Sequence, residues 1–72
     1  MTRYEYIKLI KRIDSLIQRK ATGNPTSFGR KLEISDSTLY RHIRTLRQNG
    51  APIIYDKHRG SYTYSKVFSI AH

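Results

Sequence analysis

The sequence predicts a small α+β domain in which three helices are followed by a β-hairpin. Apolar residues recur at helical spacing in three segments of the first 50 residues, and two β-favouring runs separated by a glycine-containing stretch follow the last helix. The chain has 72 residues, which suffice for one small core. We therefore expect a single domain over residues 1–72.

The first helix is expected at about residues 2–20. Its apolar stripe consists of Tyr6, Ile10, Ile13 and Ile17, widened by Leu9 and Leu16. Lysines and arginines occupy the opposite side of the helical wheel. Gly23 is expected to cap this helix or to form the turn that follows it.

A second, shorter helix is expected at about residues 25–32. Asn24 followed by Pro25 is typical of an N-cap with proline in the first helical position. Phe28 and Leu32 stand four residues apart, so they share the buried side of this helix.

The third helix is expected at about residues 35–49, after a turn too short for anything but a tight connection. Ser35 is placed as its N-cap, Gly50 as the left-handed residue after its end, and Pro52 prevents its continuation. One side of its wheel is apolar, with Leu39, Ile43 and Leu46. The other side carries Ser37, Arg41, Arg44, Thr45 and Gln48, flanked by Thr38 and Tyr40.

A hairpin is expected at about residues 53–64, with its tyrosines packed on the core. Its tip carries three basic or titratable side chains, Lys57, His58 and Arg59. The tail at residues 65–72 alternates Val67, Ser69 and Ala71 against Phe68 and Ile70, which permits one more short C-terminal strand.

Charge indicates the kind of partner. Fourteen Lys+Arg against five Asp+Glu give a net charge of +9, which favours polyanions, with nucleic acid before an anionic membrane. No apolar run is long enough to span a bilayer, and the start lacks a signal peptide, so we expect a cytoplasmic, nucleoid-associated protein.

Several function classes are not expected. Cysteine is absent, no serine has a recognisable companion base, and the histidines lack metal-ligand spacing. We therefore expect no catalytic residue, no metal and no cofactor. A chain this short is also not expected to enclose a small-molecule pocket.

The order helix, helix, tight turn, helix and basic hairpin is the plan of a winged helix-turn-helix domain. The third helix fits the DNA major groove, where guanidinium groups can bind base edges or phosphates. The hairpin, or wing, would follow the adjacent backbone or minor groove.

The same segments resemble the winged helix-turn-helix domains of DeoR-type repressors and of the biotin repressor. "KLEIS" is similar to their turn, "STLYRHIRTLRQNG" to their recognition helix, and "APIIYDKHRGSYTY" to their strand and wing. The resemblance implies double-stranded DNA as the partner. For the recognition helix it implies DNA contacts from Ser37, Thr38, Tyr40, Arg41, Arg44 and Thr45. For the wing it implies contacts from Lys57 and Arg59. His58, between them, adds a charge that depends on pH.

Three residues depart from that family pattern. Glu33 replaces the turn glycine, and a left-handed glutamate would cost about 1 kcal/mol, which favours a remodelled turn. Gly29 replaces an alanine, which weakens the second helix but permits a close helix crossing. Asp36 suits the helix dipole but repels phosphate. Repressors of this family usually carry a further sensor or enzyme domain after the wing. The sequence therefore supports the expectation of DNA binding better than the expectation of regulated repression.

Alternatives remain open at this stage. Tyr40 could contact DNA or pack against the second helix, and the wing could dominate binding while the third helix faces protein. The chain could instead be a protein-interaction module, which an exposed patch on Val67, Phe68 and Ile70 would favour. A homodimer on half-sites one DNA turn apart is compatible with either use. RNA binding and membrane adsorption rest on charge alone.

Overall fold

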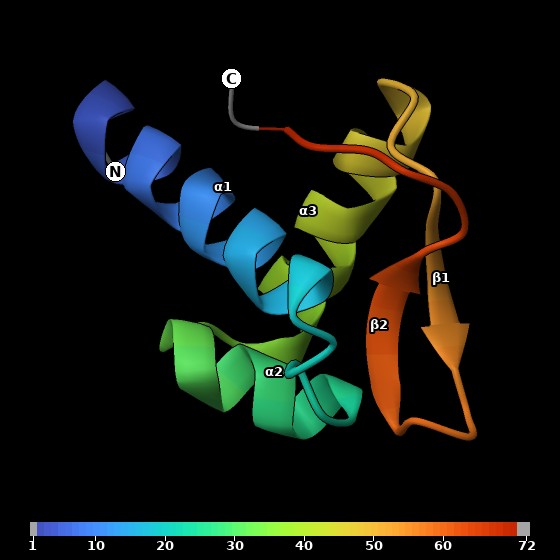
Figure 1. Ribbon diagram of the computed structural model, residues 1–72. Coiled ribbons are helices and arrows are strands. Elements are labelled where there is room, and N and C mark those ends of the chain that lie inside the picture. Colours follow the sequence, from blue (N-terminus) through green and yellow to red (C-terminus); the bar gives the residue numbers. More distant parts are fainter. Residues whose placement is uncertain (1, 71–72) are drawn as a thin grey trace.

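The computed structural model describes residues 2–70 and has three helices followed by a two-stranded antiparallel hairpin (Figure 1). The elements are α1 (Arg3–Gln18), α2 (Pro25–Leu32), α3 (Asp36–Gln48), β1 (Ile53–Asp56) and β2 (Ser61–Tyr64). The predicted fold class, a small α+β winged helix-turn-helix domain, is confirmed.

Helix α1 begins after Thr2, whose hydroxyl accepts a hydrogen bond from Glu5 N at 3.1 Å. Its end differs from the sequence prediction. Lys20, not Gly23, takes the left-handed conformation (φ 54°) that closes the helix, and Ala21 N donates to Leu16 O at 3.0 Å. The helix therefore ends at Gln18, and Gly23 (φ 71°) serves the following turn.

Helix α2 is capped by Asn24, whose Oδ1 accepts from Ser27 N at 2.8 Å. It ends at Leu32, and its C-cap Glu33 is left-handed with φ 58° and ψ 41°. The expected remodelling of this turn is therefore wrong, because Glu33 adopts the glycine-like conformation itself. Ile34 N then donates to Gly29 O at 3.0 Å, so the tight turn is kept and its strain is borne by Glu33.

Gly29 is needed where α2 approaches the start of α3. A Cβ atom at this position would lie 3.0 Å from Ile34 O and 3.3 Å from Asp36 Oδ1. The predicted close crossing is confirmed. The helix that follows is capped by Ser35, whose Oγ accepts from Thr38 N at 3.3 Å, and it is terminated by Gly50 at φ 96°.

The hairpin pairs Ile53 with Tyr64 and Asp56 with Ser61. The further strand that the alternation permits is not formed in residues 65–70, and Ala71 and His72 lie outside the described residues. Ser65 N still donates to Pro52 O at 2.8 Å, beside β1. No strand forms because the residues after Ser65 bond to side chains of α1 instead of to a strand edge. Gln18 Nε2 donates to Phe68 O, and Ile70 N donates to Asp14 Oδ1 at 3.2 Å.

One core joins all five elements. It consists of Ile13, Leu16, Ile17, Phe28, Leu32, Leu39, Ile43, Leu46, Ala51, Ile53 and Tyr62. Tyr62 packs between Phe28 and Tyr55, with ring centroids 5.7 and 5.0 Å away, and Tyr55 and Tyr64 are half-buried against the same core. The tyrosines thus fix the hairpin to the helices, as predicted.

Candidate nucleic-acid interface

The outward side of α3 is polar and accessible. Because Leu39, Ile43 and Leu46 face the core, the side chains between them point away from the protein. Tyr40, Arg41 and Arg44 are all exposed, and Tyr40 keeps 49% of its surface. Of the two alternatives for Tyr40, the structure therefore favours the outward one over packing against α2.

The hydroxyl groups of α3 are partly used inside the helix. Thr45 Oγ1 donates to Arg41 O at 3.0 Å, and Thr38 Oγ1 accepts from Ser35 Oγ at 2.9 Å. Thr38 is also half-buried, while Ser37 is exposed. Among the predicted contact residues of α3, the arginines and Tyr40 are consequently the ones with the most freedom to reach a ligand.

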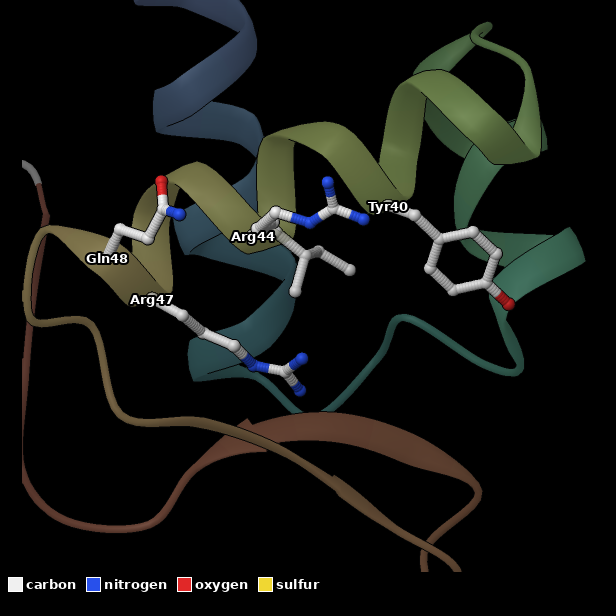
Figure 2. A pocket seen from close by; sticks show the side chains of 5 residues that line it. Tyr40, Arg44, Arg47 and Gln48 are labelled. Carbon is white, nitrogen blue, oxygen red and sulfur yellow. The ribbon is translucent and has the colours of Figure 1, made fainter.

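A groove of about 440 Å³ runs beside α3 (Figure 2). Its lining consists of Tyr40, Ile43, Arg44, Arg47 and Gln48. Arg47 lies across it and donates from Nε to Ile53 O at 3.0 Å, so this arginine ties α3 to β1. Arg44 has no such bond, and its exposed side chain extends along α3 toward Tyr40 (Figure 2).

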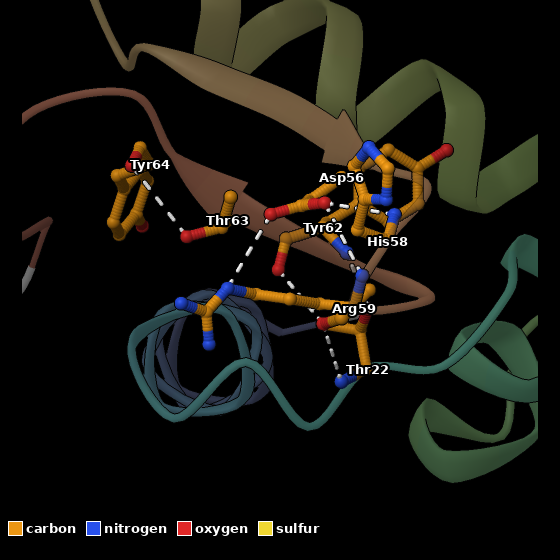
Figure 3. Close-up of polar contacts among 8 residues, drawn as sticks. Thr22, Asp56, His58, Arg59, Tyr62, Thr63 and Tyr64 are labelled. Atoms are coloured by element: carbon orange, nitrogen blue, oxygen red, sulfur yellow. Dashed lines mark hydrogen bonds and ion pairs between the residues drawn. The ribbon is translucent and has the colours of Figure 1, made fainter.

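The wing tip is shaped by Asp56, which sequence reasoning did not single out (Figure 3). Its Oδ1 accepts from His58 N at 2.9 Å and from Arg59 N at 3.2 Å, and its Oδ2 lies 3.4 Å from Arg59 Nε. An aspartate at the start of a turn with glycine at its end is the signal that could have revealed this role.

The predicted wing residues are brought together at this tip. Lys57, His58 and Arg59 are all exposed, and the Arg59 side chain keeps 58% of its surface despite the ion pair with Asp56. The carboxylate therefore orders the backbone of the tip while its cations stay accessible.

His42 lies at the border between α3 and α1. It is half-buried, and its ring centroid is 5.9 Å from that of Tyr6. Burial lowers the pKa of His42 below the ordinary 6.5, and the positive charge of Arg41 lowers it further. The imidazole is therefore more readily neutral than an exposed histidine.

The wing is attached to the loop after α1 by buried hydroxyls (Figure 3). Thr22 Oγ1 accepts from Tyr62 N at 2.8 Å and lies 3.0 Å from Ser61 Oγ, and Thr22 N donates to Ser61 Oγ at 3.2 Å. Thr22 is fully buried and Ser61 is 1% exposed. These bonds fix the position of β2, and hence of the tip, relative to the helices.

A second attachment involves Asp14, a buried carboxylate on α1. Its Oδ1 accepts from Tyr64 OH at 2.7 Å and from Ile70 N at 3.2 Å. Burial, followed by the bond to Asp14 and its charge, raises the pKa of Tyr64 well above 10. Asp14, Thr22, Ser61 and Tyr64 together form what we call the α1–hairpin seam. Tyr64 was expected to pack on the core, but local sequence patterns did not indicate these hydrogen bonds.

In residues 2–70, no group of three or more His, Asp or Glu side chains is placed to hold a metal ion. Within the same residues, none of the helices is both long and apolar enough to cross a bilayer.

Comparison with known proteins identifies the family. A family model described as an HTH domain matches residues 8–62, from α1 to β2. The chain therefore belongs to the HTH (helix-turn-helix) domain family. Searches of curated proteins and of solved structures found no match. With its basic α3 and its wing, the chain is a DNA-binding domain of the winged helix-turn-helix class used in transcription regulation, and the narrower resemblance to DeoR-type repressors stays a prediction.

Proposed function

We propose that the protein is a sequence-specific regulator that binds double-stranded DNA with α3 in the major groove and the wing tip on the backbone or minor groove. The observation that carries this proposal is the outward side of α3, where Tyr40, Arg41 and Arg44 are exposed. Their long side chains can reach base edges, and an arginine fork binds guanine O6 and N7 in two-point fashion.

Each predicted residue has a proposed role. Arg41 and Arg44 contact base edges or bind phosphate, and Tyr40 packs against the wall of the DNA major groove. The α3 hydroxyls, from Ser37, Thr38 and Thr45, add hydrogen bonds to phosphate or base edges. Lys57, His58 and Arg59 bind phosphate from the wing. Asp36 accepts from Thr26 Oγ1 at 3.4 Å, which turns part of its charge toward the protein.

We further propose that this activity requires no catalytic residue, cofactor or metal and takes place on DNA in the cytoplasm. A C2 dimer would place two copies of α3 on half-sites about 34 to 36 Å apart.

A second candidate is a protein-interaction or dimerisation module. The supporting observation lies on α1, where Tyr4 and Ile7 are 66% and 45% exposed. The tail gives less support than its sequence suggested, because Val67 is fully exposed but Phe68 and Ile70 are half-buried. Apolar exposure on α1 is compatible with DNA binding by α3.

The test is selection of binding sites from a randomised duplex library at two salt concentrations. Wild type is compared with Arg41→Ala/Arg44→Ala and with Lys57→Ala/Arg59→Ala, and Arg3→Ala/Lys66→Ala serves as a charge-matched control. We expect wild type and control to enrich one motif and the α3 variant to lose it. The wing variant should keep the motif with weaker affinity and a smaller salt slope, by about 0.9 per lost phosphate contact.

No enriched motif in wild type, or an identical loss in the control, would contradict sequence-specific binding. A palindromic motif would support the dimer.

A further inference from the structure

A second group of cations lies outside the proposed DNA interface, on α1 and the end of α2. We define the α1 basic face as Lys8, Arg12, Arg19 and Lys31, all of them exposed. The first three fall within about 40° of one another on a helical wheel. Lys31 joins them because Arg12 Nε donates to Lys31 O at 3.3 Å and Lys31 Nζ donates to Ala21 O at 2.5 Å.

Within residues 2–70, no carboxylate forms an ion pair with these cations. Among residues 2–70, the ion pair found within 4.0 Å joins Arg59 to Asp56, on the wing. Most carboxylates are placed elsewhere, since Asp14 is buried beneath Tyr64, and Glu33 and Asp36 flank the turn before α3. Glu5, in the first turn of α1, is the exposed carboxylate on this side of the helix, and it stands against four cations. Like charges at helical spacing repel each other, so the α1 basic face is a surface of net positive charge.

This face lies on the other side of the core from the α3 surface. Helix α1 buries Ile13 and Ile17, and α3 buries Leu39 and Ile43, in the same core, so their outward sides point away from each other. Figure 1 shows α1 in front of α3, and Figure 2, seen from the α3 side, shows α1 behind it.

The two surfaces belong to different helices on either side of the core. The domain measures 19 Å in its shortest direction, and the Debye length is about 8 Å at physiological salt. A duplex seated on α3 therefore leaves the cations of the α1 basic face available to a second ligand.

The dimensions and composition of the face favour duplex DNA. From Lys8 to Arg19 the helix rises about 16 Å, which exceeds the major-groove width of about 12 Å and so reaches phosphates on both sides. A helix that inserts into a membrane interface carries large apolar residues beside its cations. The most exposed apolar residues of α1, Tyr4 and Ile7, lie at its N-terminal end, where Lys8 Nζ is 5.7 Å from the centre of the Tyr4 ring. From Lys8 to Arg19 the outward side carries cations and Ser15 instead of large apolar residues, which favours phosphate contacts over insertion.

We propose that the α1 basic face binds the phosphate backbone of a second duplex, so that one molecule bridges two DNA segments. This inference rests on the proposed binding of a first duplex by α3 and the wing. It predicts contacts without base specificity, because lysine and arginine side chains on an exposed helix face bind phosphate oxygens without reading base edges.

The test is a capture experiment with two duplexes. One duplex is fixed on beads, a second carries a fluorophore, and the protein is added at increasing concentration. In the face variant, all four cations of the α1 basic face are replaced by glutamine. The matched control removes the same charge elsewhere, through Arg3→Gln, Lys20→Gln, Arg30→Gln and Lys66→Gln.

We expect the face variant to capture the second duplex at least about tenfold less well than wild type, while its affinity for a single duplex changes by less than about threefold. Four lost phosphate contacts should lower the salt slope of capture by about 3.6. The control should capture like wild type.

The outcomes separate the two proposals. Failure to bind even one duplex would overturn the proposed function, whereas binding one duplex without capturing a second would overturn only the bridging proposal. Capture that is unchanged in the face variant, as expected for a dimer that bridges through two α3 surfaces, would also overturn bridging by α1. A face variant that loses binding to phosphatidylserine vesicles but not capture would assign the face to membranes instead.

Discussion

The outward side of α3 and the α1–hairpin seam are both polar, but they differ in where their polar groups find partners. In the seam, Asp14, Thr22 and Ser61 are buried and bonded to other parts of the chain. On α3, Arg41 and Arg44 are exposed and without an ion pair in the described part of the chain. In residues 2–70, no buried side-chain nitrogen or oxygen lacks a hydrogen-bond partner.

This difference separates stability from recognition. A buried polar group that loses its partner costs about 1 to 3 kcal/mol, because it was removed from water to form that bond. Replacing an exposed arginine lowers the free energy of unfolding little, because its polar groups were already in contact with water. Changes in the seam should therefore act on folding, and changes on α3 should act on DNA.

The largest effect on stability is expected from Asp14→Ala. It would leave Tyr64 OH and Ile70 N without their acceptor, and bonds to a charged group are the stronger kind, so the free energy of unfolding should fall by about 3 kcal/mol. Urea denaturation followed by circular dichroism measures it. Arg41→Ala/Arg44→Ala is the comparison, with an expected change below about 1 kcal/mol.

An equal loss of stability in the two variants would break the comparison, because it would give α3 a structural role like that of the seam.

A smaller effect is expected from Thr22→Val, which keeps the shape of the side chain but removes its hydroxyl. Tyr62 N would lose its acceptor in the fully buried site, and the free energy of unfolding should fall by about 2 kcal/mol. Ser61→Ala should lower the free energy of unfolding less in the Thr22→Val protein than in wild type, because the two hydroxyls are partners at 3.0 Å. Additive losses in this double-mutant cycle would show that the hydroxyls act separately.

Gly29→Ala sharpens the comparison at the junction of α2 and α3. Alanine is the better helix former by about 1 kcal/mol, but its Cβ would lie 3.0 Å from Ile34 O, an overpacking that costs about 2 kcal/mol. A net loss of about 1 kcal/mol is expected in thermal or urea unfolding. Ser15→Ala, on the exposed side of α1, is the control and should not destabilise. A stabilised Gly29→Ala protein would mean that the two helices can separate without cost.

Local signals accounted for much of the fold. Asn24 before Pro25, Ser35 before the third helix and Gly50 after it act through bonds or angles within a few residues, so the sequence displays them directly. Glu33 shows the limit of such reasoning. Its type argued against a left-handed turn, but the packing of α2 on α3 imposed that conformation.

The seam could not be predicted for a related reason. Thr22 meets Ser61 across 39 positions, and Asp14 meets Tyr64 across 50, so no periodicity or spacing marks either pair. The same holds for the tail, where alternation suggested a strand but Asp14 and Gln18 of α1 supplied the partners. On α3, the wheel separated outward from buried residues, yet it gave no sign that the Thr38 and Thr45 hydroxyls would bond within the helix.

The smallest effect is expected at His42, which lies between the two regions. Its pKa in the folded protein is lowered, chiefly by burial, so below pH 6.5 the unfolded chain takes up a proton more readily than the folded one. Stability contributed by neutral His42 is therefore present above pH 6.5 and is lost as the pH falls below it.

Urea denaturation at pH 8 and pH 5 should show that acidification lowers the free energy of unfolding less in His42→Gln than in wild type. NMR titration should place the His42 midpoint below 6.5, and the midpoint should rise when DNA phosphates offset the charge of Arg41. A midpoint at or above 6.5 in the free protein would mean that the imidazole is not buried between α3 and α1, and it would assign His42 to the outward side of α3.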